Sequence, residues 1–189
     1  MGSTATPVVR TPRCDGSVMA PQAGPDVQVR DALPSDLPAV AAIYTHYVLK
    51  TTATFATSVR TPAVWLERYR AKVVDGPHTM LVAERGASVA GYVETSRFRP
   101  QDSYDTAIET SIYVAPDQSG HGVGTALYTE LFERLAGSDL HRAFAVIALP
   151  NAASIAIHER FGFVQRGVLT EAGRKFGRWL DVAYLERAL

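Results

Sequence analysis

The chain has one cysteine, no long apolar run and no excess of charge of either sign. The single thiol, Cys14, cannot form a disulfide framework or a paired metal-ligand motif. No stretch approaches the roughly 18 apolar residues of a membrane-spanning helix, and the first 26 residues lack the apolar core of a secretory signal. These absences favour a cytoplasmic protein without a membrane partner.

The balance of charge also bears on the kind of partner. The 19 Lys and Arg residues are matched by 19 Asp and Glu residues, so the broad positive surface typical of nucleic-acid-binding proteins is not expected. A small molecule is the better-fitting partner. A length of 189 residues with 47% hydrophobic residues suits a single domain with a sizeable core.

The pattern of apolar residues begins at Val27, after a Pro-, Gly- and Ser-rich segment over 1–26 that is predicted to be a flexible tail. Helical spacing, with Ser35 and Thr61-Pro62 as start signals, predicts helices over 35–49, 61–75, 125–136 and 152–160. Shorter apolar runs predict strands over 27–30, 79–84, 88–98, 106–114, 143–149, 163–169 and 179–185. We therefore predict one α/β domain over 27–189, with a mixed sheet and helices on both faces.

A glycine-rich loop, Ser119-Gly120-His121-Gly122-Val123-Gly124, joins a predicted strand to a predicted helix. Free backbone N–H groups and the positive end of a helix together favour a bound phosphate. The loop lacks the Gly-Lys-Ser/Thr ending of nucleotide hydrolases, and Thr125 stands where a dinucleotide fingerprint needs glycine. A plain tight connection remains the alternative interpretation.

This loop resembles the pyrophosphate loop of the GCN5-related N-acetyltransferase (GNAT) family, which reads Gln/Arg-x-x-Gly-x-Gly/Ala. Gly122 and Gly124 match, whereas Ser119 replaces the Gln/Arg position and Gln118 comes one residue early. The resemblance implies acetyl-CoA as cosubstrate and a mostly antiparallel sheet with a central splayed parallel pair. It also implies a set of cofactor-binding residues: Ile112, Tyr113, Val114, Gly120, His121, Gly122, Val123, Gly124, Thr125 and Asn151. For Asn151, a helix cap is a second possible role.

Further blocks resemble the phosphinothricin and methionine sulfone/sulfoximine N-acetyltransferase branch of that family. They include Glu109-Thr110-Ser111-Ile112-Tyr113-Val114, Pro150-Asn151-Ala152-Ala153-Ser154 and Gly173-Arg174-Lys175-Phe176-Gly177-Arg178-Trp179. The branch implies a small amino acid analogue as acceptor and a homodimer. Acetylation of an aminoglycoside or a protein N-terminus, and a non-catalytic acyl-CoA sensor, are the alternatives.

Acetyl transfer requires a neutral amine, yet an alkyl ammonium with a pKa of about 10.4 is neutral in roughly one molecule in 2,500 at pH 7. A nearby base is therefore useful. Glu109 is the candidate, because it interrupts an apolar run where an unpaired carboxylate is costly. The resemblance places it at the general base of the branch; a solvent-facing strand residue is the alternative.

The leaving thiolate benefits from a proton donor, and His158 and Tyr128 are the candidates. A structural histidine and a core tyrosine are their alternative roles. For the acceptor, the branch resemblance and the chemistry of oxyanion binding point to Phe55, Arg99, Tyr104 and Lys175. Because the branch is typically dimeric, a neighbouring subunit is an alternative source of Lys175. Ala56 replaces a residue that is often basic in phosphinothricin enzymes. Direct transfer without a metal ion is expected.

Overall fold

A computed structural model describes residues 26–189, so the predicted tail lies outside the described residues apart from Asp26, and Cys14 lies outside them too. The strands are β1 (Val27–Asp31), β2 (Met80–Arg85), β3 (Ser88–Arg97), β4 (Ala107–Val114), β5 (Arg142–Ala148), β6 (Val164–Lys175) and β7 (Arg178–Ala188). The α-helices are α1 (Leu37–Lys50), α2 (Pro62–Tyr69), α3 (Val123–Leu135) and α4 (Ala152–Arg160).

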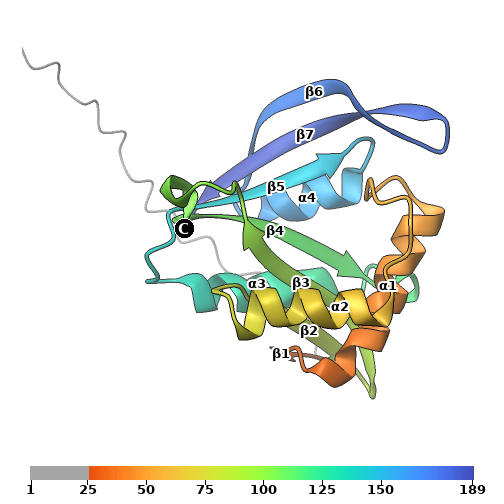
Figure 1. Ribbon diagram of the computed structural model, residues 1–189, viewed down its shortest axis with the longest axis vertical. Coiled ribbons are helices and arrows are strands. Elements are labelled where there is room, and N and C mark those ends of the chain that lie inside the picture. The colour runs from red at the N-terminus through yellow and green to blue at the C-terminus, as the bar shows by residue number, and fades with distance from the viewer. Residues whose placement is uncertain (1–25) are drawn as a thin grey trace, which may run out of the picture.

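The strands form one mixed sheet in the order β1-β2-β3-β4-β5-β7-β6. The central neighbours β4 and β5 are parallel, and all other neighbours are antiparallel. The parallel ladder is short, because only residues 107–109 of β4 pair with residues 142–144 of β5. Beyond these pairs the two strands diverge (Figure 1). The predicted mixed sheet with a splayed parallel pair is confirmed.

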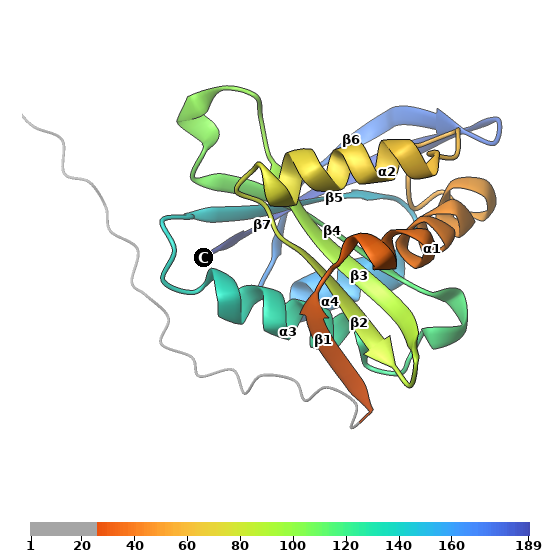
Figure 2. The same ribbon diagram turned by 60° about the horizontal axis from the view of Figure 1, so that its bottom comes forward.

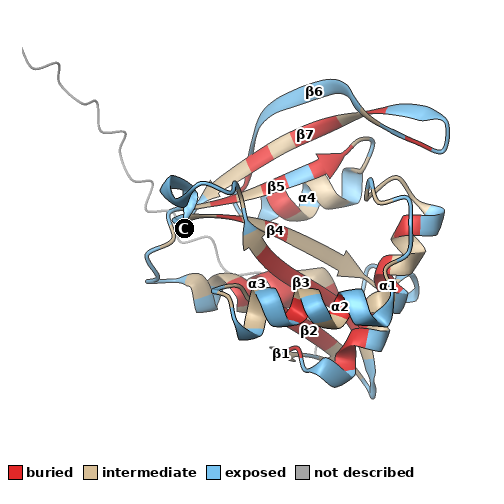
Figure 3. Cartoon of the chain, in the orientation of Figure 1, coloured by how far each residue is buried: buried red, intermediate tan, exposed pale blue. Residues whose placement is uncertain are grey.

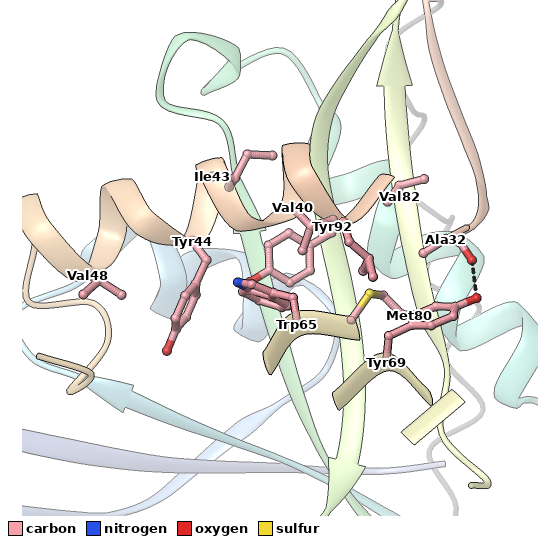
Figure 4. Packing of buried hydrophobic residues seen from close by; sticks show 11 residues of the cluster. Ala32, Val40, Ile43, Tyr44, Val48, Trp65, Tyr69, Met80, Val82 and Tyr92 are labelled. Atoms are coloured by element: carbon pink, nitrogen blue, oxygen red, sulfur yellow. Dashed lines mark hydrogen bonds between the residues drawn. The ribbon is translucent and has the colours of Figure 1, made fainter. Parts of the chain in front are cut away.

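Helices α1 and α2 cover one face of the sheet, and α3 and α4 cover the other (Figures 1 and 2). Figure 4 shows the aromatic packing under α1 and α2, where Trp65 makes edge contacts with Tyr44 and Tyr92 at ring distances of 5.5 and 6.3 Å. The Tyr69 hydroxyl donates to the Ala32 carbonyl over 2.8 Å. This packing fixes the first layer on β2 and β3.

The opposite face is filled by α3, whose spacing places Leu127, Tyr128 and Leu131 toward the sheet, all fully buried. Apolar residues at i, i+1 and i+4 form one stripe of a helix, which explains why this segment packs as it does. Helix α4 lies beside β5, and Ile155 packs on the core formed by β5 and β7. The two helices of this layer therefore lie on either side of the gap between β4 and β5.

The predicted start signals are partly confirmed. Thr61 Oγ1 accepts a hydrogen bond from Val64 N at 3.3 Å, as a cap does. Ser35 is not the cap of α1: it lies in a 3-10 turn over Pro34–Asp36, and α1 begins at Leu37. The Asp36 carboxylate organises this turn instead, since it accepts from Leu33 N and pairs with Arg30.

The last hairpin is longer than the predicted strands at 163–169 and 179–185. Strand β6 continues to Lys175 through a register shift between Leu169 and Gly173, where Glu171 has a φ of 52°. Figure 3 shows that nearly all of β6 is exposed. Within residues 26–189, none of the helices combines the length and apolar character that crossing a membrane requires.

Candidate active site

A cavity of about 480 Å³ opens where β4 and β5 separate. Its walls come from β4, the glycine-rich loop, the start of α3, β5 and α4. Nine of the ten predicted cofactor residues line it: Ile112, Tyr113, Val114, Gly120, Gly122, Val123, Gly124, Thr125 and Asn151. His121 does not line the cavity, and its side chain is exposed.

The glycine-rich loop presents backbone N–H groups to this cavity. Gly120 and Gly122 have φ values of 80° and 79°, a region that L side chains rarely adopt. Helix α3 begins at Val123, two residues before the predicted start, and its first hydrogen bond runs from Ala126 N to Gly122 O at 2.9 Å. The N–H groups of residues 123–125 therefore have no partner inside the helix and are available to an anion.

Strand β4 offers one unpaired edge to the cavity. Beyond Glu109 no strand within residues 26–189 pairs with its side toward β5, so its peptide groups can pair with an extended ligand. The Tyr47 hydroxyl, from α1, donates to the Val114 carbonyl over 2.6 Å and holds the end of this strand. Tyr47 also lines the cavity, a role that its place in a helical apolar stripe does not reveal.

Glu109 is the last β4 residue paired with β5, opposite Phe144. Side chains alternate along a strand, so Glu109 shares a face with Tyr113, which packs on Tyr44 of α1 at 5.3 Å. Its neighbour Thr110 points to the other face, where its hydroxyl lies 3.2 Å from that of Tyr128. Glu109 therefore lies at the point where β4 and β5 begin to separate, which we call the vertex of the gap. Its side chain is on the face of the sheet opposite α3.

Burial raises the pKa of Glu109 above its ordinary value. The positive charges of Arg99 and Lys72 oppose this rise, and the carboxylate of Glu94 adds to it. Glu94 is itself buried and pairs with Lys72 at 3.0 Å and Arg68 at 3.7 Å. A carboxylate with a raised pKa is a better proton acceptor than an exposed one, as general-base catalysis requires.

Aromatic residues surround the Glu109 side of the vertex. The rings of Phe98 and Phe144 stack at 3.8 Å, and Tyr104 meets Phe98 edge-on at 5.8 Å. The guanidinium of Arg99 lies 4.3 Å from the centre of the Phe98 ring and donates to the Phe98 carbonyl. The predicted acceptor residues Arg99 and Tyr104 thus gather with Phe98 in one cluster, although neither lines the cavity.

The two candidate acids are joined by a short hydrogen bond. His158 Nδ1 lies 2.7 Å from the Ser154 carbonyl, which can only accept, so Nδ1 carries the proton. His158 Nε2 then accepts from the Tyr128 hydroxyl at 2.6 Å. Burial lowers the pKa of His158, which keeps the ring neutral near pH 7. His158 lines the cavity together with Thr110, whereas Tyr128 lies behind them.

Phe55 and Lys175 lie together at the β6–β7 hairpin. The Phe55 ring packs directly on Gly173, where no Cβ would fit. The buried Lys175 ammonium donates to the carbonyls of Tyr47 at 3.2 Å and Thr54 at 2.6 Å. Neither residue lines the cavity, and these contacts tie the hairpin to the loop after α1. Their role in acceptor binding stays a prediction.

Two further lining residues escaped the sequence reasoning. Thr110 was hidden by the apolar run around it, and Arg160 by its place in a surface helix. Both residues are recognised only by hydrogen bonds to other elements, from Thr110 to Tyr128 and from Arg160 to Thr125. A single sequence does not show such contacts. In the part of the chain that the structure describes, no group of three or more His, Cys, Asp or Glu residues is arranged to hold a metal ion.

Comparison with known proteins agrees with this site. The model of the acetyltransferase (GNAT) family matches residues 41–163. The chain is 45% identical to a phosphinothricin N-acetyltransferase of Streptomyces coelicolor, over 87% of this chain and 97% of that protein. It is 36% identical to an L-methionine sulfoximine/L-methionine sulfone acetyltransferase of Pseudomonas paraeruginosa, over 84% and 92% of the two chains.

A solved structure is similar along nearly the same span. It is a GNAT superfamily phosphinothricin acetyltransferase from Sinorhizobium meliloti in complex with acetyl-CoA, with a TM-score of 0.83 and 33% identity, covering 87% of this chain and 89% of that one. The splayed strands, the glycine-rich loop and these matches lead to one conclusion: the chain belongs to the GNAT family of acetyltransferases.

Proposed function

We propose that this protein transfers the acetyl group of acetyl-CoA to the amino group of a small amino acid analogue of the phosphinothricin or methionine sulfone/sulfoximine type. The observation that carries the proposal is the vertex between β4 and β5, where a partly buried carboxylate, Glu109, adjoins a cavity edged by a phosphate-binding loop. The relatives that carry these activities in their names cover most of the chain.

The two faces of the gap suit the two substrates. The cavity between β4, the loop and α4 fits an extended thioester donor, since free N–H groups and an unpaired strand edge line it. The acceptor approaches from the other face, beside Glu109 and the aromatic cluster. Arg99 is suited to the acceptor's carboxylate or phosphinate, because a guanidinium binds such oxyanions at two points.

The reaction then runs by direct transfer. Glu109 takes a proton from the acceptor ammonium, directly or through water, and the neutral amine attacks the thioester carbonyl. The carbon–nitrogen bond forms, the carbon–sulfur bond breaks and the CoA thiolate leaves. Thr110 lies at the cavity wall, and its hydroxyl is suited to hydrogen-bond the leaving thiolate, because it is held in place by Tyr128, which in turn donates to His158. The nitrogen loses its second proton after the attack, and this proton passes to the thiolate, so that CoA leaves as the thiol.

A panel of amines, read by release of the free CoA thiol, tests the proposal. We expect turnover with phosphinothricin, methionine sulfone or methionine sulfoximine, and a fall of about 10²-fold or more in kcat for Glu109→Gln, in the range typical of a lost general base. The dissociation constant for acetyl-CoA should stay near that of the unmodified chain. Activity on polyamines, peptides or aminoglycosides alone would overturn the acceptor assignment, and tight acetyl-CoA binding without turnover of any amine would indicate a sensor.

We further propose that the protein forms a homodimer through the β6–β7 hairpin. Val168, Leu169 and Trp179 are 42%, 51% and 59% exposed there, which is unusual for large apolar side chains gathered on one hairpin. A second copy covering this surface would lie beside the loop that Lys175 anchors, close to the acceptor side of the site.

A further inference from the structure

A second carboxylate, Glu94, lies beside Glu109 on the same face of the sheet. In the antiparallel ladder of β3 and β4, Ser96 pairs with Glu109 and Glu94 pairs with Ser111. Residues that pair directly across strands share a face, so Glu94 and Glu109 are diagonal neighbours with Cα atoms about 7–8 Å apart. Two like charges at this separation disfavour each other, and a cation between them relieves the repulsion.

Lys72 supplies this cation from the end of the second helical segment. Its Nζ lies 3.0 Å from Glu94 Oε2, and Arg68 Nη2 lies farther away, 3.7 Å from Glu94 Oε1. The side chains of Lys72 and Glu94 are 19% and 10% exposed, so water and salt screen this pair much less than a surface pair. The ion pair therefore holds the charge of Lys72 in a fixed place.

The backbone that carries Lys72 departs from a regular α-helix. After α2 the chain forms one π-helical turn over Arg70–Val74, in which Asp75 N donates to the Arg70 carbonyl over 2.8 Å. The Lys72 carbonyl accepts from His78 N at 3.0 Å, which ties the turn to the segment before β2. Single π-helical turns are rare and occur frequently at functional sites. This turn fixes the backbone of Lys72 where a helix end would otherwise fray.

The charges of this pair act on Glu109 in opposite directions. Burial raises the pKa of Glu109, Lys72 lowers that pKa, and Glu94 raises it by less than Lys72 lowers it. Burial also lowers the pKa of Lys72 itself, and Glu94 opposes this fall. In the described part of the chain, the other charged or titratable groups that face these residues or one another are Arg60, Arg68, His78, Arg97 and Arg99.

We propose that Lys72 and Glu94 are positioning residues for acetyl transfer, because their buried ion pair holds one charge of each sign beside Glu109 and so sets how readily this carboxylate takes the amine proton. The proposal rests on Glu109 acting as the base, as in the proposed function. Lys72 favours the ionised carboxylate and extends activity to lower pH. Glu94 limits this effect and keeps Lys72 charged and in place.

The pH dependence of kcat, measured from about pH 5 to about pH 9 at saturating substrates, tests the proposal. Lys72→Met should move the acid limb to higher pH by roughly 0.5 to 1 pH unit, as the loss of one charge within about 10 Å of a partly buried carboxylate does. Lys72→Arg keeps the charge and should leave the limb near its original place. Glu94→Gln should move the limb to lower pH.

The double variant Lys72→Met/Glu94→Gln leaves neither partner of the pair unpaired and buried. Its two shifts oppose each other, so its acid limb should lie between those of the single variants. The difference between the double variant and Glu94→Gln gives the effect of Lys72 even where Lys72→Met alone folds poorly, because neutral replacement of a whole buried pair is well tolerated.

Two control variants separate this effect from other causes. Arg70→Gln removes an exposed charge from the same turn and should leave the limb in place. His78→Gln removes the half-buried imidazole near the pair and should also leave it in place. An unmoved limb in both Lys72→Met and Glu94→Gln overturns the proposal, as does a shift in the same direction in both or a shift confined to His78→Gln.

Glu109→Gln distinguishes a failure of this proposal from a failure of the proposed function. If Glu109→Gln keeps both its kcat and its acid limb, Glu109 is not the base and the proposed mechanism itself fails. If Glu109→Gln loses activity as expected while the limb stays unmoved in the Lys72 and Glu94 variants, only the positioning role is overturned.

Discussion

At Glu109 the strands β4 and β5 are still paired, and one residue later they are not. The carboxylate is thus held on a rigid backbone while its surroundings set its pKa. Burial raises that pKa, and the nearby charge of Arg99 lowers it. The pKa of Glu109 is therefore a balance between burial and the charge of Arg99, which a substitution at Arg99 can shift.

Arg99→Ala is therefore expected to move the acid limb of the kcat profile to higher pH. A protonated Glu109 cannot accept the amine proton, so kcat falls as pH drops through the pKa of Glu109. Without Arg99 that pKa rises further. Measuring kcat from about pH 5 to about pH 9 at saturating substrates checks this, with Arg70→Ala as the control. An acid limb at the same pH in Arg99→Ala and the unmodified chain would remove Glu109 from the role of base.

The neutral state of His158 has a consequence for stability. Its pKa is lowered in the folded state, so below about pH 6.5 the unfolded chain binds a proton that the folded chain does not. The free energy of unfolding should therefore fall as pH drops from about 7.5 to about 5.5. His158→Gln should reduce this dependence, as urea unfolding at both values would show. A dependence that is unchanged in the variant would mean that other groups cause it.

Tyr128 can be tested through the hydrogen bond that it donates. Tyr128→Phe leaves His158 Nε2 and the Thr110 hydroxyl without this partner, and an unsatisfied buried group costs about 1–3 kcal/mol. Urea unfolding should show a loss in that range. Tyr104→Phe is the control, since the Tyr104 hydroxyl makes no hydrogen bond with the described residues. Equal stability of both variants would contradict the assigned hydrogen bond.

At the scale of the elements, α3 and α4 pack closely where Gly124 of α3 meets Ile157 of α4. A methyl group at Gly124 would lie 2.7 Å from Ile157 Cδ1. Gly124→Ala should therefore lower the free energy of unfolding by about 1 kcal/mol or less, because Ile157 Cδ1 is the flexible end of its side chain and alanine favours a helix over glycine. Ile157→Val removes the clashing atom, so the double variant should lose less stability than the sum of the two single variants. Strict additivity in urea unfolding would show that the clash is relieved in another way.

Apolar spacing correctly predicts the helices and strands that bury one row of apolar side chains against the rest of the protein. The four helices and the central strands fall in this class, and Thr61 and Gly122 mark helix starts because the chemistry of a helix start is local. The end of β6 was missed because residues 170–174 have no apolar alternation, are mostly exposed and are irregular, and they pair only with β7. Lys175 likewise has no local sign that its ammonium is buried against Tyr47 and Thr54.

The candidate site follows the same division. The loop glycines and Glu109 stand out in the sequence because each breaks an expected pattern. Tyr47, Thr110 and Arg160 do not, since each joins the site through a partner 18 or more residues away in the sequence. Sequence reasoning therefore finds groups that are unusual where they stand, and misses ordinary groups that folding brings together.

For the molecule as a whole, the proposed dimerisation through the β6–β7 hairpin predicts the molecular mass in solution. Light scattering should give twice the 20.5 kDa of one chain. Leu169→Asp places a charge on the exposed hairpin and should yield monomers, because burying an unpaired charge is costly. Val74→Asp, at an exposed valine after α2, should leave the mass unchanged. A monomeric unmodified chain would exclude the dimer.

The short β4–β5 ladder also leads us to expect that the cosubstrate stabilises the folded protein. Peptide groups of residues 110–114 that face β5 pair with no other strand in the part of the chain that the structure describes, so without a ligand their amide hydrogens should exchange quickly with solvent. If acetyl-CoA binds as proposed, its pantetheine arm pairs with this strand edge, and we expect it to slow that exchange. By mass action, acetyl-CoA at about 100 times its dissociation constant adds about 2.7 kcal/mol to the free energy of unfolding. The melting temperature of this enzyme should thus report how much cosubstrate its surroundings contain.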